Sequence, residues 1–320
     1  MKRLQGDISD GGPDRSALSR IRRTAYVSGV VQCYGLLEQS VDRIIMRTAE
    51  AYGQIHASYD DLPDRVRLEF RRLALQAVID GDRARLRVPI DEATVLDSLS
   101  SSTAPALRKL VPQVFTRSQA NYRHPLVHEM LLRLDVSVDS PDTPIASSDL
   151  DVLGKSSMES ALLDLVERRN ELAHAYAVPD DILAVDQIVA LVNVVEAYLG
   201  IVEEAANARL LAECERSGAA IVVGTVAQRW SGHIGLDAKA GPLVIGEPLV
   251  FRRKGGQYIA REVASLMLND ALLERVDGGP DGRQLRVGVG FADSSPLPVV
   301  GSVALMLPEG LADLVPAQGA

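Results

Sequence analysis

Cysteine and aromatic residues are scarce in this sequence. Among its 320 residues there are two cysteines, Cys33 and Cys214, too few for a disulfide framework or a cysteine-rich zinc site. Aromatic residues make up 4% of the chain, so the extended stacking surfaces of many single-strand-binding proteins are not encoded. Neither a phosphate-binding loop nor a dinucleotide-binding glycine motif occurs. We therefore expect no cofactor and no metal ion.

The sequence also has fewer basic than acidic residues and no long hydrophobic segment. With 34 basic and 43 acidic residues, the net charge is -9. This excludes a protein that coats nucleic acid with a basic surface, but not a local arginine site. No apolar stretch reaches the roughly 18 residues of a membrane helix, and the N-terminus lacks an apolar signal segment. We expect a cytoplasmic protein with no membrane partner.

What the chain does contain is enough apolar residues for a core, in two successive patterns. Hydrophobic residues make up 47% of the chain. They recur every three or four residues across 16–212 and then form short β-rich runs across 218–308. The fold class expected is therefore α+β and multidomain, an up-and-down helical bundle followed by a small β-barrel. Residues 1–15 and 309–320 are expected to be tails.

The same patterns predict the individual elements. The expected helices cover residues 16–52, 62–79, 91–100, 125–134, 156–173 and 179–212, with a loop at 137–149. The expected strands cover residues 220–226, 243–245, 248–253, 257–263, 284–291 and 299–307, with a tight hairpin turn at 254–257.

The most informative segment lies at the end of the penultimate predicted helix. Residues 166–176 have the sequence VERRNELAHAY. Arg169 and His174 are separated by four residues, Asn170 follows the arginine, and Tyr176 follows the histidine. This pattern resembles the signature of HEPN ribonuclease domains. Residues 26–45 and 121–134 are similar to the first and middle helices of the RiboL-PSP subgroup, and the resemblance covers residues 20–205.

The resemblance implies a homodimeric endoribonuclease that needs no metal, acting as a toxin or phage-defence effector. Arg169 and His174 would be catalytic, and Asn170 would orient the histidine or the phosphate. Tyr176 would either pack near the site or be modified by a partner enzyme, as in one toxin group. Glu38 would contact the catalytic pair or lie on a solvated face. The implied partners are an RNA substrate, with tRNA and ribosomal RNA as the candidates, and a regulatory protein or antitoxin.

The chemistry of RNA cleavage suits these residue types. RNA carries its own nucleophile, the 2′-hydroxyl. Histidine titrates near neutral pH, so His174 can accept the hydroxyl proton. The planar guanidinium of Arg169 matches phosphate oxygens and can stabilise the charge that develops on them.

Helix geometry constrains this pair. Five residues along an ideal helix turn through roughly 500°, which leaves Arg169 and His174 about 140° apart. Either the helix ends near Leu172, or two copies of the motif meet across a two-fold axis. Asn170 and His174 are four residues apart and share a face.

Simpler interpretations remain for each candidate. Arg169 can pair with Glu167 or Glu171, and His174 can interact with the helix dipole. The domain would then be a non-catalytic dimeric module that binds RNA or protein. His124 and His128 have the spacing of metal ligands but no evident third ligand.

Other polar residues carry less information. His56 is expected at the surface, Cys214 in a linker and His233 in a barrel turn. Asp60 and Asp61 are expected near a helix N-cap.

The barrel has a second, less specific resemblance. Residues 241–251 and 285–291 are similar to the second-domain barrel of translational GTPases, which implies a substrate linked to tRNA or the ribosome. The alternative is a dimerisation or sensing module. Residues 252–254 are basic, and they either contact phosphate or are solvated.

Overall fold

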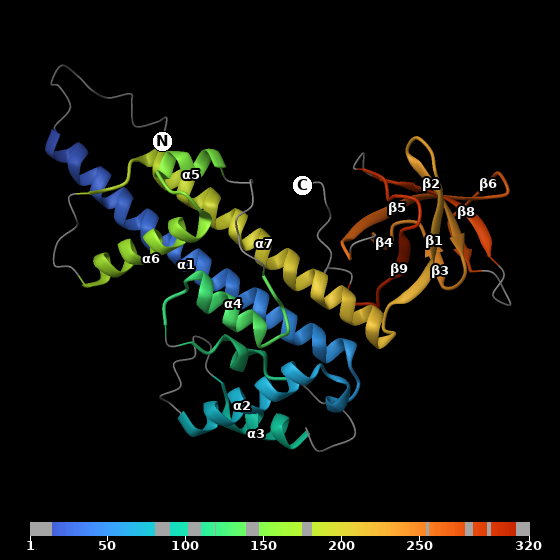
Figure 1. Cartoon of the computed structure of the whole chain (residues 1–320), viewed down its shortest axis with the longest axis horizontal. Coiled ribbons are helices and arrows are strands. Elements are labelled where there is room, and N and C mark those ends of the chain that lie inside the picture. Colours follow the sequence, from blue (N-terminus) through green and yellow to red (C-terminus); the bar gives the residue numbers. More distant parts are fainter. Residues whose placement is uncertain are drawn as a thin grey trace. The chain divides into compact units, whose positions relative to one another are not determined.

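The computed structural model describes residues 15–80, 90–101, 110–118, 120–138, 147–174, 181–253, 256–278, 284–292 and 296–311. Helices occupy the N-terminal part and strands the C-terminal part, which confirms the predicted α+β class (Figure 1). Most of the two predicted tails, and Tyr176, lie outside the described residues.

The chain forms two compact units that share its long helices. The first comprises Met1–Arg47, Leu75–Ile90 and Pro112–Glu204, and the second comprises Thr48–Ala74, Asp91–Val111 and Ala205–Ala320. The second unit therefore contains the barrel together with the C-terminal ends of the first and last helices.

All six predicted helices are present with small shifts in their ends. They are α1 (Arg15–Ile55), α2 (Asp64–Asp80), α3 (Glu92–Ser101), α4 (His124–Leu132), α6 (Met158–His174) and α7 (Val185–Ser217). The structure adds α5 (Ser147–Leu153), η2 (Tyr59–Asp61) and η4 (Pro112–Thr116). The expected loop at 137–149 therefore ends where α5 begins.

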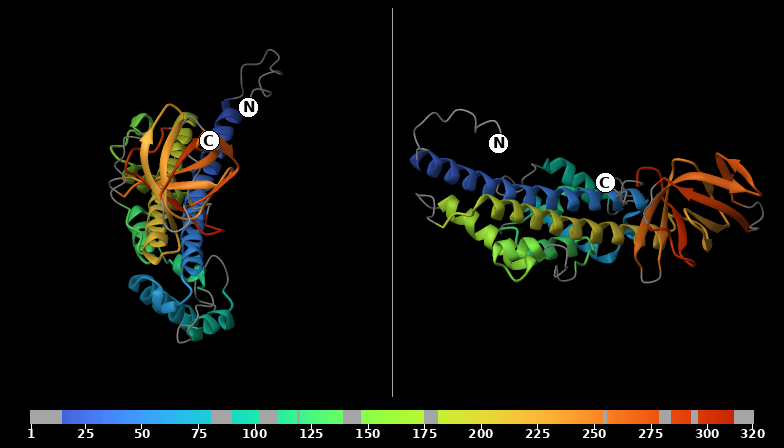
Figure 2. Two further views of the ribbon diagram at one scale, coloured as in Figure 1. Left: turned by 90° about the vertical axis from the view of Figure 1, so that its right-hand side faces the viewer. Right: turned by 90° about the horizontal axis from the view of Figure 1, so that it is seen from above.

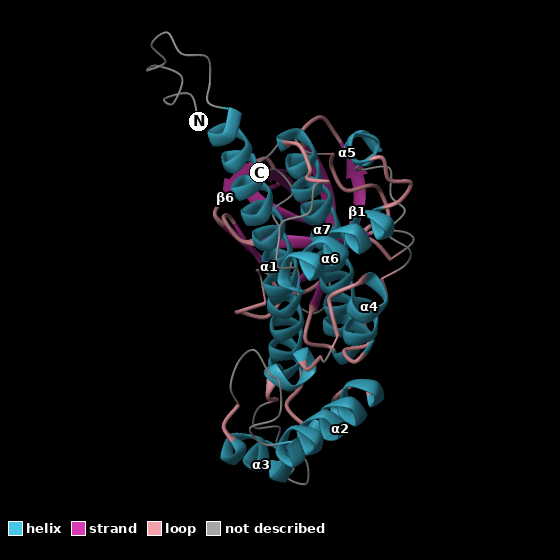
Figure 3. Ribbon diagram, turned by 90° about the vertical axis from the view of Figure 1, so that its left-hand side faces the viewer, coloured by secondary structure: helices cyan, strands magenta, loops and turns pink. Residues whose placement is uncertain are grey.

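The buried faces of α1 and α7 form much of the core of the first unit. In α1 the buried residues follow the predicted spacing of three and four: Tyr26, Val30, Cys33, Tyr34, Leu37, Val41, Ile44 and Ile45. The two helices run side by side in this unit (Figure 2), where Arg47 Nη1 lies 2.9 Å from Glu203 Oε1. Two other helices pack on this pair, since α4 contacts α7 through His124 and Tyr198, and α6 contacts α1 (Figure 3).

By length and composition alone, α7 would qualify as a membrane span. Core helices of soluble proteins pass the same test, and α7 contributes fully buried side chains such as Val194, Tyr198 and Leu210 to the core.

A closed six-stranded barrel forms the C-terminal part, as expected. Its strands pair in the order β4 (Pro248–Arg252), β9 (Val303–Met306), β1 (Ile221–Arg229), β2 (His233–Ala238), β8 (Leu285–Phe291) and β5 (Tyr258–Leu268). Pairing of β4 with β5 closes the ring, which leaves none of these six strands with an open edge.

Three short strands were not predicted as such. β6 (Ala271–Leu273) pairs with β5, β7 (Arg275–Asp277) pairs with β3 (Pro242–Val244), and β2 begins at His233. The expectation that His233 lies in a turn is therefore wrong. Because β2 has only six residues, three of them buried in succession, it lacks the alternation by which a strand is recognised from sequence.

The last turns of α7 pack on the barrel within the second unit. Leu211 is buried with Val250, Ala260 and Leu305. Glu215 Oε2 lies 2.9 Å from Arg252 Nε and accepts a hydrogen bond of 3.3 Å from the Tyr258 hydroxyl. One of the three basic residues at 252–254 is thus paired with a carboxylate of α7.

Candidate functional site

Two adjacent arginines near the end of α6 have different environments. Arg168 Nε donates to Asp164 Oδ2 at 2.7 Å, and Arg168 Nη1 donates to the Tyr26 hydroxyl at 3.3 Å. Burial opposes the charge of Arg168, but Tyr26 and Asp164 more than compensate and raise its pKa. Arg168 therefore ties α6 to α1 as part of the folded framework.

Arg169 is half-buried and makes no such ion pair. Its Nη1 donates to Asn170 Oδ1 at 3.3 Å, and its Cζ lies 4.9 Å from the centroid of the Tyr34 ring. Within the described part of the chain, no carboxylate lies at ion-pair distance from Arg169, so neither Glu167 nor Glu171 neutralises it. An arginine placed in this way keeps its charge available for an anion.

Tyr34 is the buried residue beneath Arg169. Its hydroxyl accepts a 3.2 Å hydrogen bond from the backbone N–H of Tyr122 and also contacts Glu38, one turn further along α1. Burial, reinforced by Glu38, raises the pKa of Tyr34 to about 12 although the Tyr122 N–H and Arg169 lower it. Glu38 is therefore linked to the site through Tyr34.

His174 is the second residue of the predicted catalytic pair. It is the last residue of α6 and is exposed to solvent. Because the helix continues past Leu172 to His174, the first of the two geometric alternatives is wrong. Arg169 faces Tyr34 on α1, and an ideal helix turns His174 about 140° away from it. On this ideal geometry the two side chains leave α6 on different sides, whereas Asn170 and His174 share a face.

The His124 and His128 pair is half-buried on α4. His124 is the first residue of α4, with Pro125 in the first turn, so the expectation that it precedes the regular helix is wrong. Its Nδ1 lies 3.1 Å from the Tyr198 hydroxyl, and burial lowers its pKa. Among the described residues, no group of three or more potential ligands is arranged to hold a metal ion.

A buried charged cluster in the second unit was not predicted. His56 is 4% exposed and Glu213 is fully buried, and His56 Nε2 lies 2.8 Å from Glu213 Oε1. Glu213 also accepts hydrogen bonds from Arg209 and Arg216. The expectation of a surface His56 is wrong, as is a linker position for Cys214, which is buried in α7.

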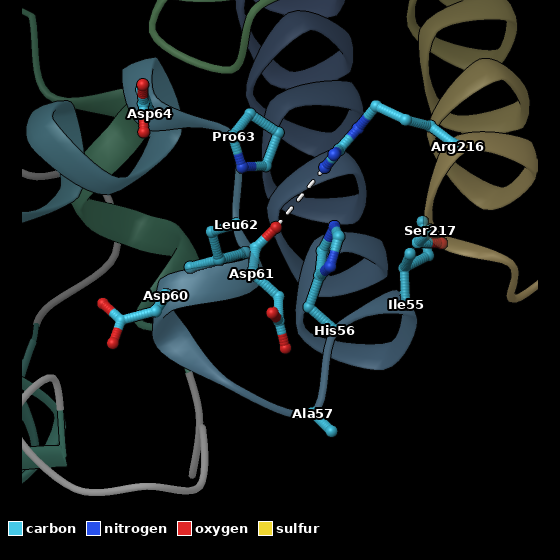
Figure 4. Close-up of a pocket in the computed structure, with 10 residues that line it drawn as sticks. All are labelled: Ile55, His56, Ala57, Asp60, Asp61, Leu62, Pro63, Asp64, Arg216 and Ser217. Atoms are coloured by element: carbon cyan, nitrogen blue, oxygen red, sulfur yellow. Dashed lines mark hydrogen bonds between the residues drawn. The ribbon is translucent and has the colours of Figure 1, made fainter.

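A cavity of about 730 Å³ lies beside this cluster, between the end of α7 and the turn after α1. Figure 4 shows Arg216 reaching across it to the carbonyl oxygen of Asp61, at 3.4 Å. Asp60 and Asp61 belong to η2, whose N-cap is Ser58. Arg209 precedes Glu213 by four residues and Arg216 follows it by three, a helical spacing from which these two ion pairs could have been predicted. The contact of His56 with Glu213 could not, because the two residues are far apart in the sequence.

Comparison with known proteins adds no assignment. No protein-family model matches the chain, and no curated protein matches its sequence.

Proposed function

We propose that this protein is a HEPN-type endoribonuclease that cleaves RNA without a metal ion, with Arg169 and His174 as its catalytic pair. The observation that carries the proposal is the contrast between Arg168 and Arg169. The fold uses Arg168 in an ion pair with Asp164, while Arg169 next to it faces no carboxylate among the described residues. A histidine exposed on the same helix end supplies the proton acceptor.

The reaction follows from the substrate and these two groups. His174 accepts the proton of a ribose 2′-hydroxyl, whose oxygen attacks the adjacent phosphorus. Arg169 stabilises the negative charge on the phosphoryl oxygens as the bond to the 5′-oxygen breaks. The departing 5′-oxygen takes up a proton, and the new 3′ end carries a cyclic phosphate that water opens to a phosphate. Asn170, on the face of His174, orients the histidine or the phosphate.

The active form in this proposal is a homodimer. A single α6 directs Arg169 and His174 to different sides, so a complete site needs Arg169 of one copy and His174 of another. Large apolar side chains near this part of the first unit are exposed, among them Ile21 on α1 and Val185 and Val189 on α7. Such residues are suited to burial against a second copy.

The biological role proposed is that of a toxin or phage-defence effector in the cytoplasm, acting on tRNA or ribosomal RNA. A regulatory partner or antitoxin would hold such an enzyme inactive. The barrel would dock the target or receive the signal.

The deciding experiment is cleavage of total RNA and bulk tRNA in EDTA by wild-type, Arg169→Ala and His174→Ala protein. Cleavage by the wild type that both substitutions abolish supports the proposal, and the fragments identify the substrate. Equal behaviour of all three proteins, with no cleavage, favours a non-catalytic module that binds RNA or protein.

A further inference from the structure

On the outer wall of the barrel, two ring side chains each lie against a glycine. Across β1, β2, β8 and β5, outward positions pair as Gly235 with Gly288 and as His233 with Gly290. A Cβ added at Gly235 would lie 3.0 Å from Cη2 of Trp230, so the indole lies directly over this glycine. In the same way His233 lies over Gly290, with its Cδ2 2.9 Å from a Cβ built there.

Trp230 is held in place but remains accessible. Its backbone N–H donates to the His233 carbonyl oxygen at 2.9 Å, which closes a tight turn in which Gly232 has a φ of +79°. The indole covers Gly235 on one side and is nevertheless 46% exposed. Packing over a glycine restricts the ring before any ligand arrives, so little further ordering is needed for binding.

The chain segment around Trp230 bears no negative charge. No acidic residue occurs from Arg216 to Leu236, although acidic residues outnumber basic ones in the whole chain. The next acid, Asp237, is paired with Arg286 through contacts of 2.8 and 3.2 Å. Arg229, directly before Trp230, is exposed and has no carboxylate at ion-pair distance within the described part of the chain.

His233 adds a directional polar group beside the ring. Its Nδ1 lies 3.1 Å from the carbonyl oxygen of Ser231, a contact that requires the proton on Nδ1. In the neutral ring with the proton on Nδ1, Nε2 carries the lone pair and is an acceptor. Exocyclic amino groups of nucleobases are donors of the matching kind.

We infer that Trp230 is a stacking platform for an unpaired base of a single-stranded RNA, with His233 Nε2 accepting a hydrogen bond from the base. Stacking needs a base whose faces are uncovered, which single strands offer and duplexes do not. The choice of RNA as ligand rests on the proposed function. The site itself is independent of Arg169 and His174.

Because Trp230 is the only tryptophan, its fluorescence reports this surface alone. The full-length protein is titrated with a short 2′-O-methyl RNA strand, which has no free 2′-hydroxyl and is not cleaved. The same strand in a duplex and a linear polyphosphate serve as controls. We expect saturable quenching by the single strand and little change with either control.

Three variants test the geometry through the anisotropy of a labelled strand. Trp230→Ala should weaken binding by about tenfold or more, since stacking on an aromatic residue contributes ~1–3 kcal/mol per base. Trp230→Phe keeps a ring and should bind nearly as the wild type. Gly235→Ala retains the tryptophan but displaces it, so it should weaken binding while leaving Trp230 in the chain. Thermal unfolding of each variant identifies any that fails to fold.

Unchanged binding by Gly235→Ala and Trp230→Ala would overturn the inference, as would equal quenching by polyphosphate. Quenching by lipid vesicles but not by RNA would assign the surface to a membrane instead. If the wild type cleaves RNA and the Trp230 and Gly235 variants bind RNA as it does, the stacking inference is refuted and the proposed nuclease activity is not. If RNA binding depends on Trp230 as expected but no cleavage depends on Arg169 and His174, the proposed nuclease function is refuted and the stacking inference is not.

Discussion

The guanidinium of Arg169 lies over the ring of Tyr34, with Cζ 4.9 Å from the ring centroid. This contact connects the end of α6 with the buried face of α1. The aromatic face holds the guanidinium in position, and apart from the Nη1 group that donates to Asn170 its N–H groups can bind an anion.

Two substitutions at Tyr34 distinguish the role of its ring from that of its hydroxyl. Tyr34→Phe keeps the ring under Arg169 but leaves the Tyr122 N–H without its partner, so it should cost about 1 kcal/mol of stability and retain cleavage. Tyr34→Leu also removes the ring, and we expect kcat to fall further than in Tyr34→Phe. Denaturant unfolding and single-turnover cleavage measure the two effects. Equal kcat for both variants would contradict a positioning role for the ring.

The adjacent arginines provide a matched pair of substitutions. Arg168→Ala removes one of the two cationic partners of Asp164, which keeps Lys155, together with the contact with Tyr26, and should destabilise the protein by about 2 kcal/mol. Arg169→Ala removes only the Tyr34 and Asn170 contacts and should unfold near the wild-type midpoint, with RNA cleavage lost. Thermal unfolding and cleavage assays are run on both proteins. If Arg168→Ala abolished cleavage without loss of stability and Arg169→Ala destabilised the protein, Arg168 and not Arg169 would be the catalytic arginine.

Mixing inactive proteins tests whether the site forms between two copies. Arg169→Ala and His174→Ala proteins are each expected to be inactive. In an equal mixture, half of randomly exchanged dimers combine the two, and each has one of its two sites intact, so about a quarter of wild-type activity should return. The measurement is cleavage after subunit exchange, with a doubly substituted protein as control. No recovery, despite exchange shown by mass, would exclude the shared site.

The His56 and Glu213 pair predicts a loss of stability in acid. Burial lowers the pKa of His56 below its ordinary value of 6.5, although Glu213 opposes this, and Arg216 and Asp61 act more weakly in opposite directions. The unfolded chain therefore takes up a proton near pH 6.5 while the folded protein does not. The contribution of His56 is complete above that pH and is lost as the pH falls toward its folded pKa.

Glu213 acts in a lower pH window. Burial raises its pKa, but hydrogen bonds from Arg216 and Arg209 outweigh this and hold the pKa below the ordinary 4.5. Its contribution is present above pH 4.5 and is lost as the pH falls through the folded value. The midpoint of urea unfolding is measured against pH for the wild type and for His56→Gln. The substitution should flatten the slope just below pH 6.5, and an identical slope would show that His56 does not contribute.

Sequence periodicity predicted the longer helices, because a buried helix face repeats every three or four residues and α1 and α7 keep that repeat over many turns, but it missed the seven-residue α5. The barrel strands with clear apolar runs were also predictable. β2, β6 and β7 were not. β6 and β7 have three residues each, too few for a pattern, and β2 has six residues without clear alternation. The spacing of Arg169 and His174 was enough to predict that one straight helix would separate them.

Tertiary structure alone decided which residues share an environment. The sequence shows two neighbouring arginines. Only the packing of α6 on α1 brings Arg168 within hydrogen-bond distance of the Tyr26 hydroxyl and places the Arg169 guanidinium over the Tyr34 ring. It likewise buries His56 beside Glu213 and lays Trp230 over Gly235. Contacts such as His56 with Glu213 join residues far apart in the chain. Periodicity records which face of an element is apolar, whereas the partner of each polar side chain depends on how the elements pack.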